Sequence, residues 1–341
     1  MATRFIRSAS LTHYADVALA AGLDPRRMLA EFGLPPTCPD EPETKVPVGA
    51  VRDLLEASAE RSGVEAFGLL MAEKRRLAHL GPLGLLMREQ PTMRHALQAL
   101  ARYANRINQA MFLTLEEAGD VVVLREELIV GGSGSIRQAT ELAIGVAFLA
   151  LRALLGDAWK PVRVCFAHDP PASRDVHHRI FGRIVEFGHA FNGIVCARAD
   201  LEIRNPEADP VMARYARDIV EESLSHRPAM TDHVRELVVT MLSSGDCTIE
   251  RAAGQLGMTR RTIHRHLERE GQTFSGIVDD VRRELASRYV ADKHRSLTEV
   301  SELLGFSAPS GFSRWYRRQF KQPASRLRPV GAGKRVRKVK A

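Results

Sequence analysis

The sequence has few cysteines and no hydrophobic run long enough to cross a membrane. Its four cysteines are widely spaced and form no C-x-x-C pair: Cys38, Cys165, Cys196 and Cys247. This spacing argues against a disulfide framework and against a structural zinc site. The most apolar stretch, Leu142 to Leu151, has ten residues, whereas a helix needs about 20 residues to cross a bilayer. We therefore expect no membrane span and no metal site.

The sequence also lacks an export signal and the short motifs of several enzyme classes. Residues Met1 to Leu11 contain two arginines but no continuous apolar core of signal-peptide length. None of the patterns G-x-S-x-G, G-x-x-x-x-G-K or H-E-x-x-H occurs in the chain. We expect a cytoplasmic protein that is not an enzyme and uses no cofactor.

The positive charge of the chain is concentrated near its C-terminus. The whole sequence carries a formal net charge of +8. Residues 231–341 hold 22 Lys and Arg against 12 Asp and Glu, a net charge of +10, whereas residues 1–230 carry −2. Such a local excess suits a polyanion, because each neutralised phosphate releases counterions. The C-terminal part is therefore the expected nucleic-acid-binding region.

The first part of the chain predicts an α+β domain that begins with helices. Apolar residues recur at helical spacing from about residue 10 to residue 110, and one helix is expected from Pro91-Thr92 to about Asn108. After this helix, apolar residues recur at every second position instead. Met111 to Leu115 and Val121 to Leu128 flank the turn-rich Glu117 to Asp120, which predicts an antiparallel hairpin.

Further elements complete this domain and lead to a second one. We expect a long apolar helix over Ile136 to Leu155, a short helix near Asp175 to Phe181, and strands over Val162 to Ala167, Ile184 to Phe187 and Gly193 to Ala197. The first domain then spans residues 1–210, and a linker helix and hinge span residues 211–230. An all-helical domain is expected over residues 231–328, and a basic, disordered tail over residues 329–341.

The second domain contains two copies of one short pattern. In the first copy a helix ends at Gly257, Thr259 can cap the next helix, and Ile263 and Leu267 give that helix a buried side. In the second copy the glycine returns 48 residues later as Gly305. Each copy predicts a helix-turn-helix, and the second copy has one extra residue in its turn.

A rigid helix is expected between the two copies. Phe274 to Asp292 contains no proline and places Ile277, Val281, Leu285 and Tyr289 four residues apart. At 1.5 Å per residue, about 18 residues span roughly 27 Å. This length is comparable with the roughly 34 Å that separate major-groove faces one DNA turn apart. One subunit could therefore place both second helices in successive grooves.

The exposed side of each second helix supplies the candidate DNA contacts. Base-reading candidates lie opposite the apolar residues of each helix: Arg261, His264 and Arg265 opposite Ile263 and Leu267, and Ser310, Ser313 and Arg314 opposite Phe312 and Tyr316. Arginine suits guanine because its fork matches the O6 and N7 acceptors. The candidates for contact with the DNA backbone are Thr259, Arg260, Ser307, Arg318, Lys321, Arg326, Arg328 and the run from Lys334 to Lys340.

The doubled pattern and the phrase Gly305-Phe-Ser-x-x-Ser-x-Phe-Ser-Arg314 closely resemble the DNA-binding domain of the AraC/XylS family of bacterial transcription regulators. The resemblance covers residues 231 to about 328. Glu270 to Phe274 with Arg282-x-x-x-Ala286 is similar to the linker helix of that family, and Phe320 to Arg328 is similar to its tail. The family usually carries Gly and then Ser/Thr-Pro in this tail, where this chain has Lys321 and Pro323-Ala324.

Phrases of the first domain resemble the arabinose-binding-type sensor domain of the branch that includes ornithine-utilisation regulators. They are Ala21-Gly-Leu-Asp-Pro25, Leu80-Gly-Pro-Leu-Gly-Leu-Leu-Met87, Arg137-Gln-Ala-Thr-Glu141, Phe166-Ala-His-Asp-Pro170 and Phe181-Gly182. The resemblance spans about residues 10–215. It implies that the first domain senses a small-molecule effector and supports a homodimer, while the second domain binds double-stranded promoter DNA. By the habit of the family the regulator is an activator that also contacts RNA polymerase.

Two other functions remain open at this point. One is a constitutive or partner-controlled DNA-binding regulator whose sensor domain has lost its ligand. The other is an enzyme fused to a DNA-binding domain, which needs a nucleophile, metal or phosphate-loop set that no local motif supplies.

Two groups of polar residues in the first domain invite a ligand interpretation. Arg137, Gln138 and Glu141 lie at the start of an apolar helix, where they could contact a ligand or form a structural ion pair. Four histidines could suggest a metal or haem, but they lack cysteines or carboxylates at ligand spacing. We therefore interpret these histidines as surface or capping groups: His168, His177, His178 and His189.

Overall fold

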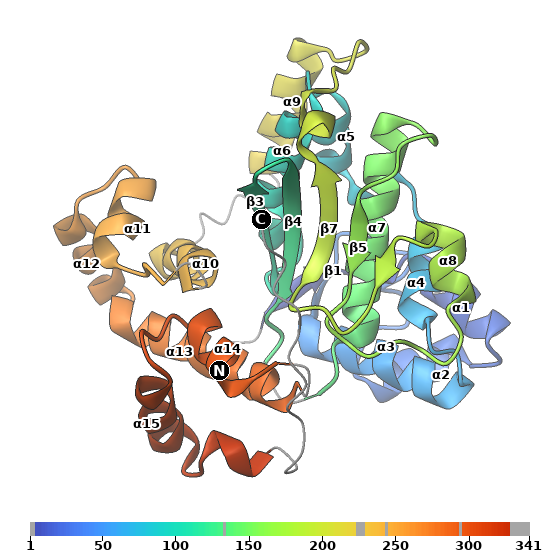
Figure 1. Cartoon of the computed structure of the whole chain (residues 1–341). Coiled ribbons are helices and arrows are strands. Elements are labelled where there is room, and N and C mark those ends of the chain that lie inside the picture. The colour runs from blue at the N-terminus through green and yellow to red at the C-terminus, as the bar shows by residue number, and fades with distance from the viewer. Residues whose placement is uncertain (1–3, 132–133, 223–228, 243–244, 293–294, 328–341) are drawn as a thin grey trace. The chain divides into compact units, whose positions relative to one another are not determined.

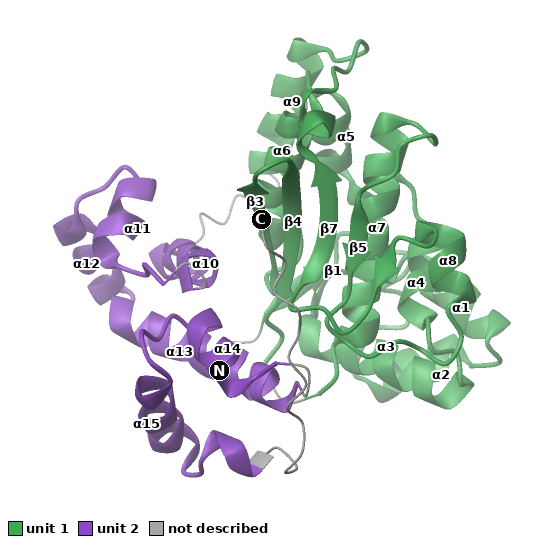
Figure 2. Ribbon diagram, viewed as in Figure 1, with its two compact units in different colours: residues 1–225, 341 green, residues 226–340 purple. Residues whose placement is uncertain are grey.

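The computed structural model describes residues 4–131, 134–222, 229–242, 245–292 and 295–327. The chain divides into two compact units, residues 1–225 and residues 226–340 (Figure 2). Each unit is described by itself. The expected α+β domain followed by an all-helical domain is confirmed, since every strand among the described residues lies in the first unit.

The first unit begins with a series of helices, as the spacing of apolar residues predicts (Figure 1). The helices are α1 (Tyr14–Ala20), α2 (Pro25–Glu31), α3 (Val48–Ser62), α4 (Phe67–Glu73), the 3-10 turn η2 (Leu77–Leu80), α5 (Pro82–Arg88) and α6 (Met93–Ile107). Asp24 caps α2 and Thr92 caps α6 through their side-chain oxygens. A short antiparallel pair, β1 (Phe5–Arg7) with β2 (Lys45–Pro47), was not predicted, because three residues are too few to show a period of two.

A five-stranded sheet follows, with strand order β3-β4-β7-β5-β6. The strands are β3 (Met111–Ala118), β4 (Val121–Leu128), β5 (Arg163–Cys165), β6 (Val185–Glu186) and β7 (Asn192–Ala197). The predicted hairpin is confirmed, since β3 and β4 pair antiparallel from Met111 opposite Leu128 to Ala118 opposite Val121. Among the strands that the structure describes, β5 and β6 are the one parallel pair, and the predicted short helix α8 (Asp175–Phe181) lies between them in the chain.

The long apolar helix α7 (Arg137–Leu155) forms the centre of this unit. It contacts β4 and β7 of the sheet and also α3 and α4, so it buries side chains on several faces, including Leu142, Ile144, Phe148 and Leu151. A Cβ atom at Gly145 would lie 2.7 Å from the Cβ of Ala72. The glycine thus allows α4 and α7 to approach closely.

The length and composition of α7 alone would also permit a membrane span. Among the described residues it is the one helix that meets this test, with a hydropathy of 1.5 over the most apolar window. However, 56% of that window is buried inside the protein. This burial is what the central helix of a folded domain requires.

The predicted linker helix is α9 (Pro210–Glu222), and it packs within the first unit. It contacts α5, and the hydroxyl of Tyr103 on α6 donates a hydrogen bond to Glu221 Oε1 at 2.8 Å. Residues 223–228, which include part of the predicted hinge, lie outside the described residues.

The second unit contains helices throughout its described residues. They are α10 (Met230–Leu242), α11 (Ile249–Gln255), α12 (Arg260–Arg269), α13 (Phe274–Ala291), α14 (Leu297–Leu303), α15 (Pro309–Phe320) and the 3-10 turn η4 (Ala324–Leu327). The predicted stripe on α13 is confirmed, because Ile277, Val281, Leu285 and Tyr289 are all buried. α10 and α14 pack against this central helix.

Candidate DNA interface

The first helix-turn-helix consists of α11, a turn through Gly257, and α12. Thr248 caps α11 and Thr259 caps α12, where its Oγ1 accepts a hydrogen bond from Thr262 N at 3.2 Å. Gly257 has φ 62°, a left-handed conformation that glycine adopts at little cost. Ile263 and Leu267 are fully buried, so the opposite side of α12 faces solvent.

The three base-reading candidates of α12 are all exposed. Arg261 and Arg265 have no hydrogen-bond partner among the described residues, and both guanidinium forks are available to a ligand. Arg260 is placed differently, because its Nη1 lies 3.1 Å from Glu250 Oε1 on α11. Its Nε also donates to His264 Nε2 at 3.4 Å. Arg260 therefore ties the two helices together, and a contact with phosphate would require it to leave this pair.

The second helix-turn-helix consists of α14, a longer turn, and α15. Ser296 and Glu299 form a reciprocal capping box at the start of α14. The turn places Phe306 against Phe312 and Trp315, with ring centroids 5.8 and 5.5 Å apart. Ser307 is exposed in this turn and leaves the capping position of α15 to Ala308, which offers no side-chain hydrogen bond.

The candidates of α15 lie on its exposed side, opposite the buried Phe312 and Tyr316. Ser310 and Arg314 have no hydrogen-bond partner among the described residues. Ser313 differs, because its hydroxyl donates to Pro309 O at 2.9 Å within the same helix. Arg314 therefore presents an exposed guanidinium beside Ser310 on this side of α15.

Arg282 on α13 holds the turn of the second helix-turn-helix in place. Its Nε donates to Leu304 O at 2.9 Å and its Nη2 donates to Gly305 O at 3.2 Å. The guanidinium also lies 4.5 Å from the ring centroid of Phe306. Burial lowers the pKa of Arg282 below the usual arginine value. The sequence offered Arg282 as part of a linker motif, but its role in orienting this turn required the fold.

α15 is also fixed directly to the central helix. Trp315 Nε1 donates to Asp279 Oδ1 at 3.0 Å, and Arg283 donates to Gln319 Oε1 through Nη2 at 3.1 Å. α13 thus separates the two helix-turn-helix copies and also forms the surface on which α15 packs.

The basic residues in the last turn of α15 and after this helix extend the exposed positive surface. Arg318, Lys321 and Arg326 are exposed. Lys321 ends α15 with φ 59°, the left-handed conformation that glycine usually supplies at a helix end. Arg328 and the run from Lys334 to Lys340 lie outside the described residues.

In the first unit, a polar cluster gathers on the buried carboxylate of Glu141. Glu141 Oε1 lies 3.1 Å from Arg137 Nε, 3.1 Å from His177 Nε2 and 3.3 Å from His168 Nε2. The interpretation of His177 as a surface or capping group is therefore wrong, because its side chain is fully buried beside Glu141. Gln138 accepts a hydrogen bond from Gly68 N and donates to Glu65 O, so this residue also has a structural role.

One set of side chains in this unit is compact enough to share a metal ion. The ligand atoms of Cys165, Glu186 and His189 lie within 4.8 Å of one another. Burial raises the pKa of the Cys165 thiol to about 12, and Arg163 lies 3.5 Å from Glu186. A protonated thiol and a competing guanidinium both oppose metal binding here.

Comparisons with known protein families cover both units. The family described as "Arabinose-binding domain of AraC transcription regulator, N-term" matches residues 22–205, and the family described as "Helix-turn-helix domain" matches residues 252–329. The transcriptional regulator VirS of Mycobacterium tuberculosis is 28% identical, covering 96% of this chain and 97% of VirS. The ornithine utilization regulator of Pseudomonas aeruginosa is 25% identical, covering 89% of this chain and 90% of that protein.

Two further proteins are similar to this chain. The transcriptional activator NphR of a Rhodococcus species is 34% identical over 95 residues, which are 28% of each chain. The crystal structure of the transcriptional regulator CdpR from Pseudomonas aeruginosa is 21% identical and covers 91% of this chain and 97% of its own, with a TM-score of 0.42.

Proposed function

This chain belongs to the AraC family of transcription regulators, and we propose that it reads one operator with both of its helix-turn-helix units. In this proposal Arg261, His264 and Arg265 of α12 contact base edges in one major groove. Ser310 and Arg314 of α15 contact base edges in the next groove. Backbone phosphates are bound by residues at the ends of these helices and in the tail: Thr259, Arg260, Ser307, Arg318, Lys321 and Arg328.

The observation that carries this proposal is the pair of exposed arginine-bearing helices joined through one central helix. α13 contains 18 residues, so it is about 27 Å long, close to one turn of DNA. The contacts of Arg282 and Trp315 restrict the orientation of α15 relative to this helix. A fixed separation favours an operator with two contacted segments on the same face of the duplex.

We further propose a dimeric, cytoplasmic protein whose first unit binds a small-molecule effector and which activates transcription with RNA polymerase. The effector would act by binding one arrangement of the regulator more tightly than another. A constitutive or partner-controlled regulator is the second candidate. Enzymatic activity is not part of the proposal, because the relatives are transcriptional regulators.

The substitution Arg265→Ala tests the base-reading role. We expect it to weaken binding to the operator by about 1 to 3 kcal/mol, because one bidentate arginine contact to guanine is lost. Binding to random DNA should change little. Fluorescence anisotropy on operator DNA and random DNA of equal length, at two salt concentrations, measures both quantities.

Arg26→Ala is a matched control, since Arg26 is an exposed arginine on α2 in the first unit. It removes the same charge and should leave both affinities unchanged. An equal loss on operator and random DNA for Arg265→Ala would show that Arg265 contacts only phosphate.

A further inference from the structure

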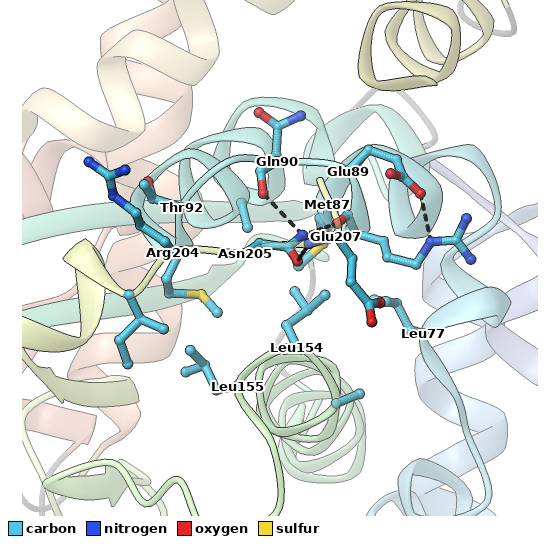
Figure 3. A pocket seen from close by; sticks show the side chains of 15 residues that line it. Leu77, Met87, Glu89, Gln90, Thr92, Leu154, Leu155, Arg204, Asn205 and Glu207 are labelled. Atoms are coloured by element: carbon cyan, nitrogen blue, oxygen red, sulfur yellow. Dashed lines mark hydrogen bonds and ion pairs between the residues drawn. The ribbon is translucent and has the colours of Figure 1, made fainter. Parts of the chain in front are cut away.

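The first unit contains a pocket of about 440 Å³ between α5, α6, α7 and the segment that precedes α9 (Figure 3). This volume lies within the range of roughly 300 to 1,000 Å³ that is typical of small-molecule sites. The pocket is distinct from the polar cluster on Glu141 and shares no residue with it.

One side of the pocket is built from side chains that form no hydrogen bonds. Leu77 comes from η2, Met87 from α5, Met93 and Ala96 from α6, and Leu154 and Leu155 from the end of α7. In Figure 3 Leu154 and Leu155 lie across the pocket from Asn205. This side therefore suits an apolar group and leaves a hydroxyl without a partner.

The opposite side is polar, but most of its hydrogen-bonding groups already bond to other groups of the protein. Asn205 Nδ2 donates to Arg88 O at 2.6 Å and to Gln90 O at 3.2 Å, and Asn205 Oδ1 accepts from Glu207 N. Glu89 accepts from Arg88 Nε and from Asp209 N. These bonds attach the segment over residues 203–209 to the connection between α5 and α6.

Two charged groups on this polar side have no such partner. Arg204 and Glu207 are exposed, and neither side chain forms a hydrogen bond or ion pair among the described residues. These two residues can bind a polar head group on this side, whereas hydroxyls that face the opposite, apolar side would lose their hydrogen-bond partners. Ile203, which is 43% exposed, extends the apolar side to the same segment.

We propose that this pocket is the effector site and that it takes a small amphipathic molecule with one polar head and an apolar body, not a sugar. The inference rests on the proposed function, in which the first unit binds an effector. The segment over residues 203–209 leads directly into α9, the last helix of the first unit. A ligand that contacts this segment can therefore change the stability or position of α9.

The test uses the full chain and two kinds of probe. 4-Phenylbutyrate serves as the amphipathic probe and L-arabinose as the sugar. We expect saturation-transfer NMR signals for 4-phenylbutyrate and a rise of several degrees in melting temperature at saturating concentration, with neither effect for L-arabinose. Absence of both effects for 4-phenylbutyrate, or both effects for L-arabinose, overturns the proposal.

The variant Ala153→Trp places a large side chain in the pocket from an exposed position on α7. We expect the affinity for 4-phenylbutyrate to fall about tenfold or more. Ala30→Trp, at an exposed position on α2, is the matched control and should bind the probe normally. Equal binding by both variants places the probe elsewhere and overturns the site.

Operator binding by both variants without any probe separates this inference from the proposed function. Loss of probe binding with intact operator binding supports the pocket. If operator binding is absent from the unmodified chain, the proposed DNA-reading function fails whatever the probe does.

Discussion

Lys321 occupies a backbone conformation that a residue with a Cβ atom adopts at a cost. Its φ of 59° lies in the left-handed region, where residues other than glycine lose roughly 1 to 2 kcal/mol. The AraC family usually has glycine at this point of its tail. The lysine thus combines an exposed positive charge with a strained helix end.

Lys321→Gly and Lys321→Ala separate these two properties. We expect Lys321→Gly to raise the free energy of unfolding of the second unit by about 1 kcal/mol, because glycine relieves the backbone strain. Lys321→Ala retains the Cβ atom and should not stabilise. Both variants should weaken DNA binding equally if the lysine contacts phosphate. Urea unfolding and DNA titration measure the two effects, and equal stability of the two variants would contradict the strain argument.

The imidazole of His168 makes the first unit sensitive to acid. Burial lowers the pKa of His168 below its ordinary value of 6.5. The unfolded chain therefore takes up a proton near pH 6.5 while the folded chain does not. Stability is lost as the pH falls from about 6.5 toward the lower pKa of the folded state.

We expect His168→Gln to reduce this dependence. Between pH 7 and pH 5 the free energy of unfolding of the first unit should fall less steeply in the variant than in the original chain. Chemical denaturation at a series of pH values gives this slope. His178→Gln, at an exposed position on α8, is the control and should leave the slope unchanged. Identical slopes for all three proteins would contradict the role given to His168.

Single residues were predictable where their partners are close in the sequence. Thr259 was predicted to cap the helix that follows it, and its side chain accepts from a backbone N–H three residues later. Thr248 and Ser296 make the same local contact at the start of α11 and α14. The pairing of Glu141 with His177 joins residues 36 positions apart. No local pattern brings these two residues together, so the burial of His177 required the fold.

At the scale of elements, the two helix-turn-helix copies have equivalent glycines in unequal surroundings. Gly257 and Gly305 have φ of 62° and 69°. A Cβ atom at Gly257 would meet nothing within 4 Å, whereas one at Gly305 would lie 2.9 Å from Leu242 O. The second turn is therefore packed against α10, and the first turn is open.

Alanine substitutions should expose this difference. Gly257→Ala should cost about 1 to 2 kcal/mol, the price of the left-handed conformation alone. Gly305→Ala should cost at least about 1 kcal/mol more, because a backbone carbonyl must also move. Urea unfolding of the second unit measures both. Equal destabilisation by the two substitutions would show that α10 can move away from position 305 without loss of stability.

The main elements were predictable because their periods are long and regular. The hairpin of β3 and β4, the buried helix α7 and the striped helix α13 each follow from spacing over eight or more residues. β5 and β6 are shorter than predicted, since the apolar residues around them also pack in loops. The pocket is lined by side chains that are scattered in the chain between Leu77 and Glu207, and no sequence pattern marks such a site.

At the scale of the whole molecule, the division into two units predicts independent folding of the second. Its described helices bury their own core, which includes Val238, Leu267, Val281 and Phe312. A fragment of residues 226–341 should therefore be helical by circular dichroism and unfold cooperatively in urea. It should bind operator DNA without any response to effector. A fragment that is unfolded alone would show that the second unit depends on the first.

The length of α13 also limits which insertions and deletions a lineage of this protein can accept. One added residue lengthens the helix by 1.5 Å and rotates its far end by about 100°. DNA rotates by about 36° per base pair, so about three base pairs restore the rotation, but they add about 10 Å along the axis. No shift in the operator matches both changes. If α12 and α15 read one operator as proposed, substitutions in these helices can change its base sequence, while the spacing between its two segments stays tied to the number of residues in α13.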